Sequence, residues 1–349
     1  MSTLTAGSKI LVTGATGFIG AQVCNEFLKA GHTVVGTTRK AARAQKLREY
    51  FERYGAGKFE VAEIEDLEQE GAFDELVKDV EAIAHVASPV FVESDDPVKD
   101  YLNKAVNGTL SILNSALRYG KSVKHVVVTS SSASVVRGNS APEYAHTEED
   151  WNTDASEMMK QLLEKKQPVP HMVGYAASKV EAERALWKFR EEAKPHFYIS
   201  TVLPTFVIGE ILPPPGKGKP EEIISSSSKL VLDYYTGENQ DPAFTFGSGN
   251  RVAVVDVALA HVRAAQRGQA TDGQRYILNN RYLSFQEVVD ILRKHYPDRN
   301  NIIVEGNPGQ YGVCPKSLDG SKATRELGIQ YTDLETAVVE TVESVKQAY

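Results

Sequence analysis

The first 205 residues alternate short apolar runs with stretches in which apolar residues recur at helical spacing. Ile19, Val23 and Phe27 follow this helical spacing, and Gly31 ends the stretch. The apolar runs, rich in β-branched residues, cover 9–13, 33–38, 58–64, 82–87, 124–130 and 197–203. Strands that alternate with amphipathic helices predict an α/β fold, a doubly wound parallel sheet with helices on both faces.

The pattern loosens after Pro204, where proline, glycine and serine become frequent. We expect residues 1–205 to form a Rossmann-type domain to which 250–270 return, and 206–249 with 271–349 to form a smaller α/β substrate lobe. In that lobe, Ser284 and Glu287 have the spacing of a capping box, which predicts a helix through about Lys294. A last amphipathic helix is predicted from about Leu334.

Composition narrows the class of protein. Of 349 residues, 42% are hydrophobic and 24% charged, and the net charge is −7, so we expect no nucleic-acid partner and no anionic membrane partner. No apolar run approaches the roughly 18 residues of a membrane-spanning helix, and no signal segment is evident. Cys24 and Cys314 lack the spacing of metal ligands or a redox pair, so we expect no metal and a cytoplasmic location.

The first apolar run leads directly into a glycine-rich segment, Thr13-Gly14-Ala15-Thr16-Gly17-Phe18-Ile19-Gly20. Glycines spaced in this way permit a tight turn, close approach of the backbone to a pyrophosphate, and close packing of helix on strand. The helix that follows offers free N–H groups and the positive end of its dipole. This segment predicts a dinucleotide-binding turn.

The second apolar run ends in Arg39 and Lys40, followed by Arg43, with no acid before Glu49. An acid here would bind the ribose hydroxyls of NAD, whereas a guanidinium suits the 2′-phosphate of NADP. Lys40 and Arg43 fit a solvated helix start equally well. After the third run, Asp66 and Leu67 either frame the adenine or form a surface turn.

Tyr175 and Lys179 lie four residues apart in an alanine-rich helical stretch, so both side chains project from one helix face. An ammonium next to a phenol favours the tyrosinate and brings its proton transfer nearer to neutral pH. The fifth run ends in a hydroxyl cluster, Thr129-Ser130-Ser131-Ser132, at the sheet edge where α/β proteins bind ligands. One of these hydroxyls is expected to bind a substrate carbonyl oxygen, and the chemistry does not select which. Ser88-Pro89, after the fourth run, either lines the nicotinamide side or ends the strand.

Together these residues resemble the extended short-chain dehydrogenase/reductases, and more narrowly the dihydroflavonol-4-reductase-like group with its fungal NADPH-dependent aldehyde, ketone and methylglyoxal reductases. The similarity runs from about Gly7 to about Lys346. Besides the segments above, it rests on His85-Val86-Ala87-Ser88-Pro89, Asn107-Gly108-Thr109, Asp256-Val257-Ala258 with His261, and Ser321-Lys322-Ala323 with Leu327-Gly328.

The resemblance implies that Ser131, Tyr175 and Lys179 are catalytic. It also implies that Arg39 binds the 2′-phosphate, with Lys40 or Arg43 as a second basic partner, and that Pro204 packs near the nicotinamide. Position and resemblance together predict contacts of NADPH with Gly14, Thr16, Gly17, Phe18, Ile19, Gly20, Arg39, Lys40, Arg43, Asp66, Leu67, Ala87, Ser88, Pro89, Tyr175, Lys179 and Pro204.

The expected reaction is NADPH-dependent reduction of aldehydes or ketones, with Tyr175 as proton donor and Ser131 polarising the oxygen. Position along the fold suggests a substrate pocket formed by Ser131 with Phe91, Val92, Thr205, Phe206 and Val207. A nucleotide-sugar epimerase or dehydratase that retains NAD, and a hydroxysteroid-type dehydrogenase, are the alternatives. We expect a small-molecule carbonyl substrate and either a monomer or a homodimer.

Overall fold

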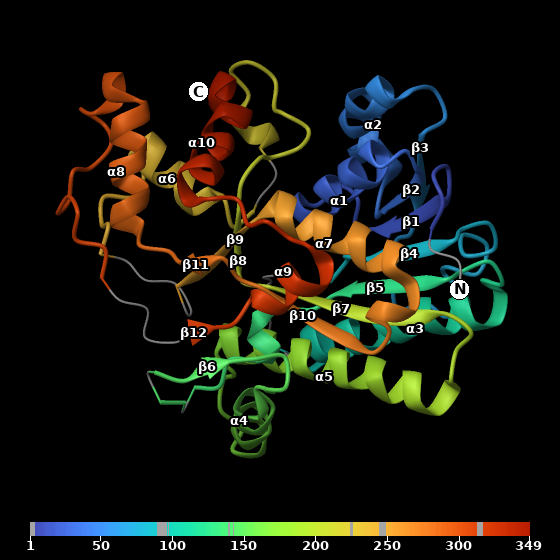
Figure 1. Cartoon of the computed structure of the whole chain (residues 1–349). Helices are drawn as coiled ribbons and strands as arrows, with labels where there is room; N and C mark the ends of the chain where they lie inside the picture. The colour runs from blue at the N-terminus through green and yellow to red at the C-terminus, as the bar shows by residue number, and fades with distance from the viewer. Residues whose placement is uncertain are drawn as a thin grey trace.

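A seven-stranded sheet lies at the centre of the protein (Figure 1). The computed structural model describes residues 4–88, 96, 98–138, 140–141, 143–223, 226–243, 249–312 and 317–349. The strands are β1 (Lys9–Thr13), β2 (Thr33–Thr38), β3 (Phe59–Glu63), β4 (Ala82–His85), β5 (His125–Thr129), β7 (Tyr198–Pro204) and β10 (Gln274–Leu278). All neighbouring pairs are parallel, in the order β10-β7-β5-β4-β1-β2-β3. The strand order reverses between β1 and β4, which is where such sheets bind ligands at their carboxyl edge.

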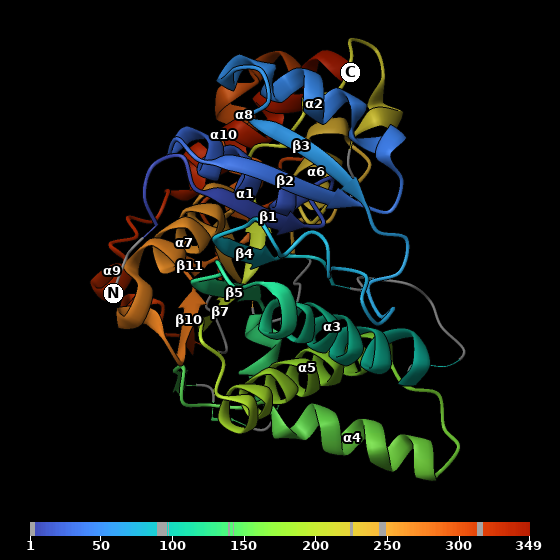
Figure 2. The same cartoon turned by 90° about the vertical axis from the view of Figure 1, so that its right-hand side faces the viewer.

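Helices cover both faces of this sheet (Figures 1 and 2). On one face lie α3 (Lys104–Tyr119) and α5 (His171–Ala193), and α4 (Thr153–Glu164) packs outside α5. On the other face α1 (Phe18–Lys29) packs against α7 (Val254–Arg267). The predicted α/β doubly wound fold is therefore confirmed.

The alternation of side chains along the strands explains the two layers of core. Ile10 and Val12 of β1 join the buried cluster beneath α1 and α7, whereas Leu11 joins the cluster beneath α3 and α5. Successive strand residues point to opposite faces, so a strand buried on both faces is apolar throughout. For this reason the apolar runs near the start of the chain predict strands.

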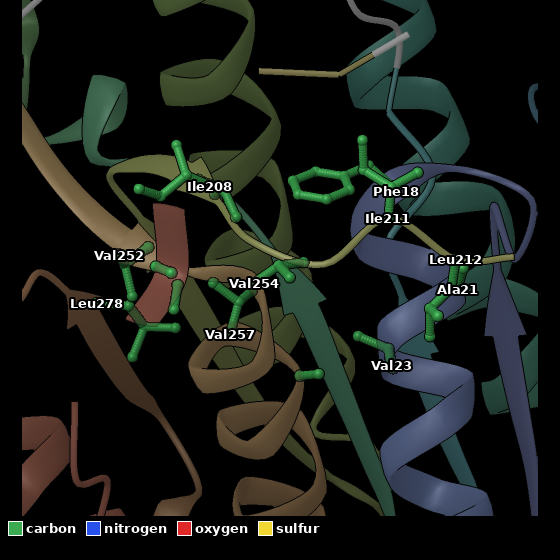
Figure 3. Close-up of a cluster of buried hydrophobic side chains, with 14 of the residues drawn as sticks. Phe18, Ala21, Val23, Ile208, Ile211, Leu212, Val252, Val254, Val257 and Leu278 are labelled. Atoms are coloured by element: carbon green, nitrogen blue, oxygen red, sulfur yellow. The ribbon is translucent and has the colours of Figure 1, made fainter. Parts of the chain in front are cut away.

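The remaining strands form two smaller sheets. A three-stranded sheet joins β8 (Phe206–Ile208), β9 (Asn250–Ala253) and β11 (Arg281–Tyr282), and β6 (Ala145–His146) pairs with β12 (Ser317–Leu318). The helices α6 (Lys229–Thr236), α8 (Phe285–His295) and α10 (Leu334–Val345) pack on one another, whereas α9 (Ser321–Leu327) packs against β10 and α7. The helix α2 (Gln45–Phe51) follows β2. Figure 3 shows how the segment after β8 is fixed: Ile211 and Leu212 lie beside Phe18 and Ala21 of α1 in one buried cluster.

Two expectations about this region need correction. The predicted lobe included all of 271–349, but Gln274–Leu278 pairs with β7 and extends the main sheet. This five-residue strand, Gln-Arg-Tyr-Ile-Leu, carries no sign of which sheet it joins. The helix predicted at Ser284 is present, but neither bond of the capping box forms: the side chain of Ser284 makes no capping hydrogen bond, and the Glu287 carboxylate pairs with Arg281.

Within the described part of the chain, no helix is long and apolar enough to cross a membrane.

Candidate active site

The glycine-rich segment forms a tight turn between β1 and α1. Gly14 has φ +69°, a conformation that favours glycine, and its carbonyl oxygen accepts a hydrogen bond from Gly17 N at 2.9 Å. Two contacts fasten the turn to β2: Ala15 N donates to Thr37 O at 2.9 Å, and the hydroxyls of Thr16 and Thr38 lie 3.2 Å apart. The turn is thus held at the sheet edge with its backbone groups fixed.

The helix after this turn begins as an anion site requires. A Cβ on Gly20 would lie 2.1 Å from Gly14 O, so only glycine lets α1 approach the turn this closely. Gly17 is the N-cap and has no side chain to accept the first N–H groups of α1. The turn therefore fits a pyrophosphate group. Phe18 is 8% exposed and its side chain packs in the core, so only its backbone is available to contact a bound group.

Three cations gather just beyond β2. The side chains of Arg39, Lys40 and Arg43 are exposed, and among the described residues none has a hydrogen-bond or ion-pair partner. The nearby backbone is fixed, since Ala41 N donates to the Glu63 carboxylate at 2.6 Å. The cluster could hold a 2′-phosphate, and the structure does not favour one of Lys40 and Arg43 as the second partner.

The end of β4 is brought against the glycine turn by Thr13. Its hydroxyl accepts hydrogen bonds from Val86 N at 3.1 Å and Ala87 N at 3.0 Å, and it lies 3.0 Å from His85 Nδ1. Burial lowers the pKa of His85 to about 4, so the ring is neutral and satisfied, as expected for a core histidine. Ala87 is thereby placed directly beside Gly14.

Asp66 and Leu67, which follow β3, lie in different surroundings. The Asp66 carboxylate accepts a hydrogen bond from Glu68 N at 2.9 Å, which is a local turn. Leu67 instead lines a cavity between α3, α5 and the sheet edge, together with Ser88, Lys104 and Lys179. Of this pair, Leu67 is the one that the structure places beside the other predicted site residues.

Lys179 is the charged centre of that cavity. It is 6% exposed, and its ammonium donates to Ser88 Oγ at 2.9 Å and to Thr129 O at 3.5 Å. Burial lowers the pKa of Lys179 to about 8, against the opposing effect of the Glu183 carboxylate. One ammonium, charged at neutral pH, thus links α5 to the carboxyl ends of β4 and β5.

Ser131 and Tyr175 meet at the same place. The Ser131 hydroxyl lies near enough to the Tyr175 phenol to affect its pKa, and Ser131 Oγ accepts from Ala133 N at 3.1 Å. Burial raises the pKa of Tyr175, and the Ser131 hydroxyl opposes this only partly. The Lys179 ammonium lies 5.9 Å from the centre of the Tyr175 ring. The expected lowering of the tyrosine pKa by this ammonium is therefore not found, and the phenol stays protonated at neutral pH.

The predicted substrate residues, and the two prolines predicted to lie near the cofactor, are only partly placed. Pro89, Phe91 and Val92 lie outside the described residues. Pro204 is buried at the end of β7 beside Leu278 of β10. Thr205 is fixed by its hydroxyl, which donates to Leu278 O at 3.0 Å. Phe206 and Val207 lie in β8, where Phe206 pairs with Arg251. The pocket remains a prediction.

Two buried contacts were missed by the sequence reasoning. His261 of α7 lies 2.7 Å from the Thr129 hydroxyl, and its Nδ1 donates to Val257 O at 2.8 Å. Glu183, one turn after Lys179, pairs with Arg275 at 2.8 Å. The i, i+4, i+8 spacing of Tyr175, Lys179 and Glu183 was the available signal for the carboxylate, while nothing in the sequence marked Arg275 as its partner.

With this geometry in place, comparison with known proteins is informative. Residues 10–278 match the NAD dependent epimerase/dehydratase family. The chain belongs to this family. The match covers most of the chain and ends at the last residue of β10. The resemblance to the extended short-chain dehydrogenase/reductases is confirmed.

Among relatives, aldehyde reductase 2 of Sporidiobolus salmonicolor is 33% identical over 85% of this chain and 83% of its own. Ketoreductase azaE of Aspergillus niger is 31% identical over 97% of each chain. Among solved structures, yeast methylglyoxal/isovaleraldehyde reductase Gre2 complexed with NADPH has a TM-score of 0.82 at 30% identity, covering 96% of this chain and 97% of that one.

Metal ligands do not cluster in the described residues: no group of three or more histidine, cysteine or acidic side chains could hold a metal ion there.

Proposed function

We propose that this protein reduces aldehydes and ketones to alcohols with NADPH as the hydride donor. The observation that carries the proposal is the convergence of the Ser131 hydroxyl and the Tyr175 phenol beside the buried ammonium of Lys179, at the carboxyl edge of the sheet. The named activities of the relatives, aldehyde, ketone and methylglyoxal reduction, support the same reaction.

The cofactor has a fitting set of residues in this chain. The turn at Gly14 to Gly20 and the start of α1 suit the pyrophosphate, the exposed Arg39 suits the 2′-phosphate, and Ser88 and Lys179 lie where the nicotinamide ribose is expected. When bound, NADPH supplies the hydride that goes to the carbonyl carbon. The structure of Gre2 complexed with NADPH, similar over nearly the whole chain, supports this choice.

The side chains account for the proton. Tyr175 is protonated at neutral pH because burial raises its pKa, so its hydroxyl is a donor. Ser131 donates a hydrogen bond to the carbonyl oxygen, which polarises the carbonyl and orients it toward Tyr175. As negative charge grows on the oxygen, the Tyr175 proton moves to it, and the tyrosinate that remains shares the buried site with the Lys179 ammonium, 5.9 Å from the ring centre. Water then restores the tyrosine proton.

The test is steady-state oxidation of NADPH and NADH with an aryl aldehyde, an α-keto ester, methylglyoxal and a dihydroflavonol. We expect turnover that favours NADPH, and a fall of about 10²–10⁴-fold in Tyr175→Phe, the range for a general acid. That variant should still bind NADPH by fluorescence titration, because it loses one hydroxyl and keeps the other predicted cofactor contacts. No turnover with any carbonyl, from protein that purifies with bound NAD, contradicts the proposal and favours a nucleotide-sugar epimerase or dehydratase.

A further inference from the structure

A fully buried ion pair lies beneath the proposed catalytic residues. The side chain of Glu183 is 1% exposed and that of Arg275 is 9% exposed, and Nε of the arginine lies 2.8 Å from Oε1 of the glutamate. The carboxylate also accepts hydrogen bonds from Ser130 Oγ at 2.7 Å and Thr201 Oγ1 at 2.9 Å. Burying two charges costs about as much as their attraction returns, so a buried pair is weak evidence for a role in stability. Its position suggests a different role.

The pair holds the turn that carries Ser131. Ser130 precedes that residue and donates to Glu183 Oε2. Ser134 follows it, and the Ser134 hydroxyl lies 2.8 Å from both Glu183 Oε2 and Ser131 O. Both ends of this short turn are therefore bound to one carboxylate. A shift of that carboxylate would move the Ser131 hydroxyl relative to Tyr175.

Arg275 extends the support to the next loop. Its Nη1 donates to Asp150 O at 2.8 Å and also to Glu148 O, and its guanidinium stacks 3.9 Å from the Trp151 ring centre. Asn152 of the same loop donates through its side chain to Ala133 O at 2.9 Å. The arginine thus fixes both the Glu183 carboxylate and the loop that packs against the Ser131 turn.

The same carboxylate faces the cavity of Lys179. Glu183 follows Lys179 by one helical turn, and both line the cavity between α3, α5 and the sheet edge. The other titratable groups there are His85 of β4, which is neutral, and Lys104 of α3, a second cation. Burial alone would raise the pKa of Glu183, but Arg275 and the serine hydroxyls bring it below its ordinary value, so the carboxylate is charged at neutral pH.

Glu183 is therefore a buried anion that opposes the loss of the Lys179 proton. Tyr175 is uncharged, and the positive charge of Arg275 is offset by its pairing with Glu183. Glu148, in the loop held by Arg275, accepts from Ile277 N at 3.0 Å, and burial raises its pKa.

We propose that Glu183, held by Arg275, is a positioning residue that fixes the Ser130–Ser134 turn carrying Ser131 and sustains the positive charge of Lys179. The inference rests on the proposed reductase activity, since it assigns Glu183 its effect through the residues of that reaction. Glu183 touches neither substrate nor cofactor in this scheme.

The experiment compares Glu183→Gln, which keeps the size and removes the charge, with Arg190→Gln. Arg190 lies on the same helix and pairs with Asp272 at 2.6 Å, two turns beyond Glu183. In wild type we expect the rate to fall as Lys179 deprotonates above about pH 8. In Glu183→Gln this alkaline fall should begin at least about half a pH unit lower, because the negative charge beside Lys179 is lost. The kcat at pH 7 should drop about tenfold, because the Ser130–Ser134 turn also loses its carboxylate anchor. Arg190→Gln should leave the pH profile unchanged.

Two further variants keep the proposal falsifiable if Glu183→Gln does not fold. Glu183→Asp retains the charge and should keep the wild-type alkaline limb even where its Tm falls. Ser134→Ala should lower kcat without moving the limb, because it loosens the turn and leaves the charge. A purely structural pair would lower Tm in Glu183→Gln and leave its pH profile at wild type, or leave kcat of Ser134→Ala unchanged; either result overturns the proposal.

A binding measurement separates this inference from the activity. NADPH fluorescence titrations from pH 6.5 to about 9.5 follow the charge of Lys179 without turnover, and the curve of Glu183→Gln should again lie at lower pH. If wild type reduces no carbonyl but the two curves differ, the activity fails and the positioning role stands. If wild type is an active reductase and the curves coincide, the positioning role is wrong.

Discussion

Replacing Gly20 by alanine should damage the cofactor turn more than any other single methyl group added there. The new Cβ would meet Gly14 O at 2.1 Å, Gly14 C at 2.8 Å and Ala15 Cα at 3.2 Å, all of them backbone atoms that no rotamer change can move. Carbon in ordinary contact lies at about 3.5–4.0 Å. The start of α1 must therefore retreat from the turn by roughly 1 Å or more.

The expected magnitude follows from two opposing effects. Overpacking of this kind costs about 1–3 kcal/mol, with a 2.1 Å approach to backbone at the upper end, and alanine in place of glycine inside a helix returns about 1 kcal/mol. We expect a net loss of about 2 kcal/mol in the free energy of unfolding and a fall in Tm of about 3 °C for a chain of this length. NADPH affinity should fall at least tenfold, about 1.4 kcal/mol, as the N–H groups of α1 move off the phosphates.

The assay is thermal unfolding together with NADPH fluorescence titration of Gly20→Ala. The matched control is Gly138→Ala, in a loop, where the new Cβ would meet Asp154 Oδ2 at 3.9 Å and no nearer atom of the described residues, and this variant should unfold within about 0.5 kcal/mol of wild type. A Gly20→Ala protein with wild-type Tm and wild-type NADPH affinity would refute the reasoning, since the close approach of α1 would then have no consequence.

Three other predictions use separate features. Arg39→Ala should raise KM for NADPH about tenfold or more and leave KM for NADH within twofold, because it removes only the partner of the 2′-phosphate; equal effects on both cofactors would contradict this. Because burial lowers the pKa of Lys179 to about 8, kcat should fall as pH rises through 8 while Tyr175 stays protonated, and a rate that is flat to pH 9.5 would contradict it. Asp333→Ala removes the cap at Thr336 N, 2.8 Å away, and should cost about 1 kcal/mol of stability by thermal unfolding without changing NADPH affinity; unchanged stability would exclude a capping role.

The strands of the main sheet were readable in the sequence for a physical reason. A strand buried on both faces needs apolar residues at every position, so β1 and β5 appear as continuous runs with little ambiguity. Strand partners are a different matter. The pairing of β10 with β7 depends on contacts between residues far apart in the chain, and the five residues of β10 carry no mark of it.

The same distinction holds at the site. The hydroxyl cluster at 129–132, Tyr175 and Lys179 could be predicted because the carboxyl ends of parallel strands meet at one edge and because residues four apart share a helix face, while the choice of Ser131 within the cluster came from the family resemblance. Glu183 shares that face and was within reach of the same argument, but Arg275 lies 92 residues away. The sequence also does not show whether a side chain points to a ligand or to the core. Phe18, the first residue of α1, lies next to the glycine turn, but its side chain packs in the buried cluster.

His261 shows how support for the site reaches it from the opposite face of the sheet. Its Nδ1 must carry the proton, because it donates to the carbonyl oxygen of Val257, and burial lowers the pKa of the ring to about 4. Nε2 is therefore an acceptor, and the Thr129 hydroxyl donates to it. The carbonyl oxygen of Thr129 in turn accepts from Lys179. Through His261, α7 thus fixes the end of β5 to which the Lys179 ammonium binds. The position of Lys179 therefore depends on helices of both layers and not on the Tyr175–Lys179 spacing alone.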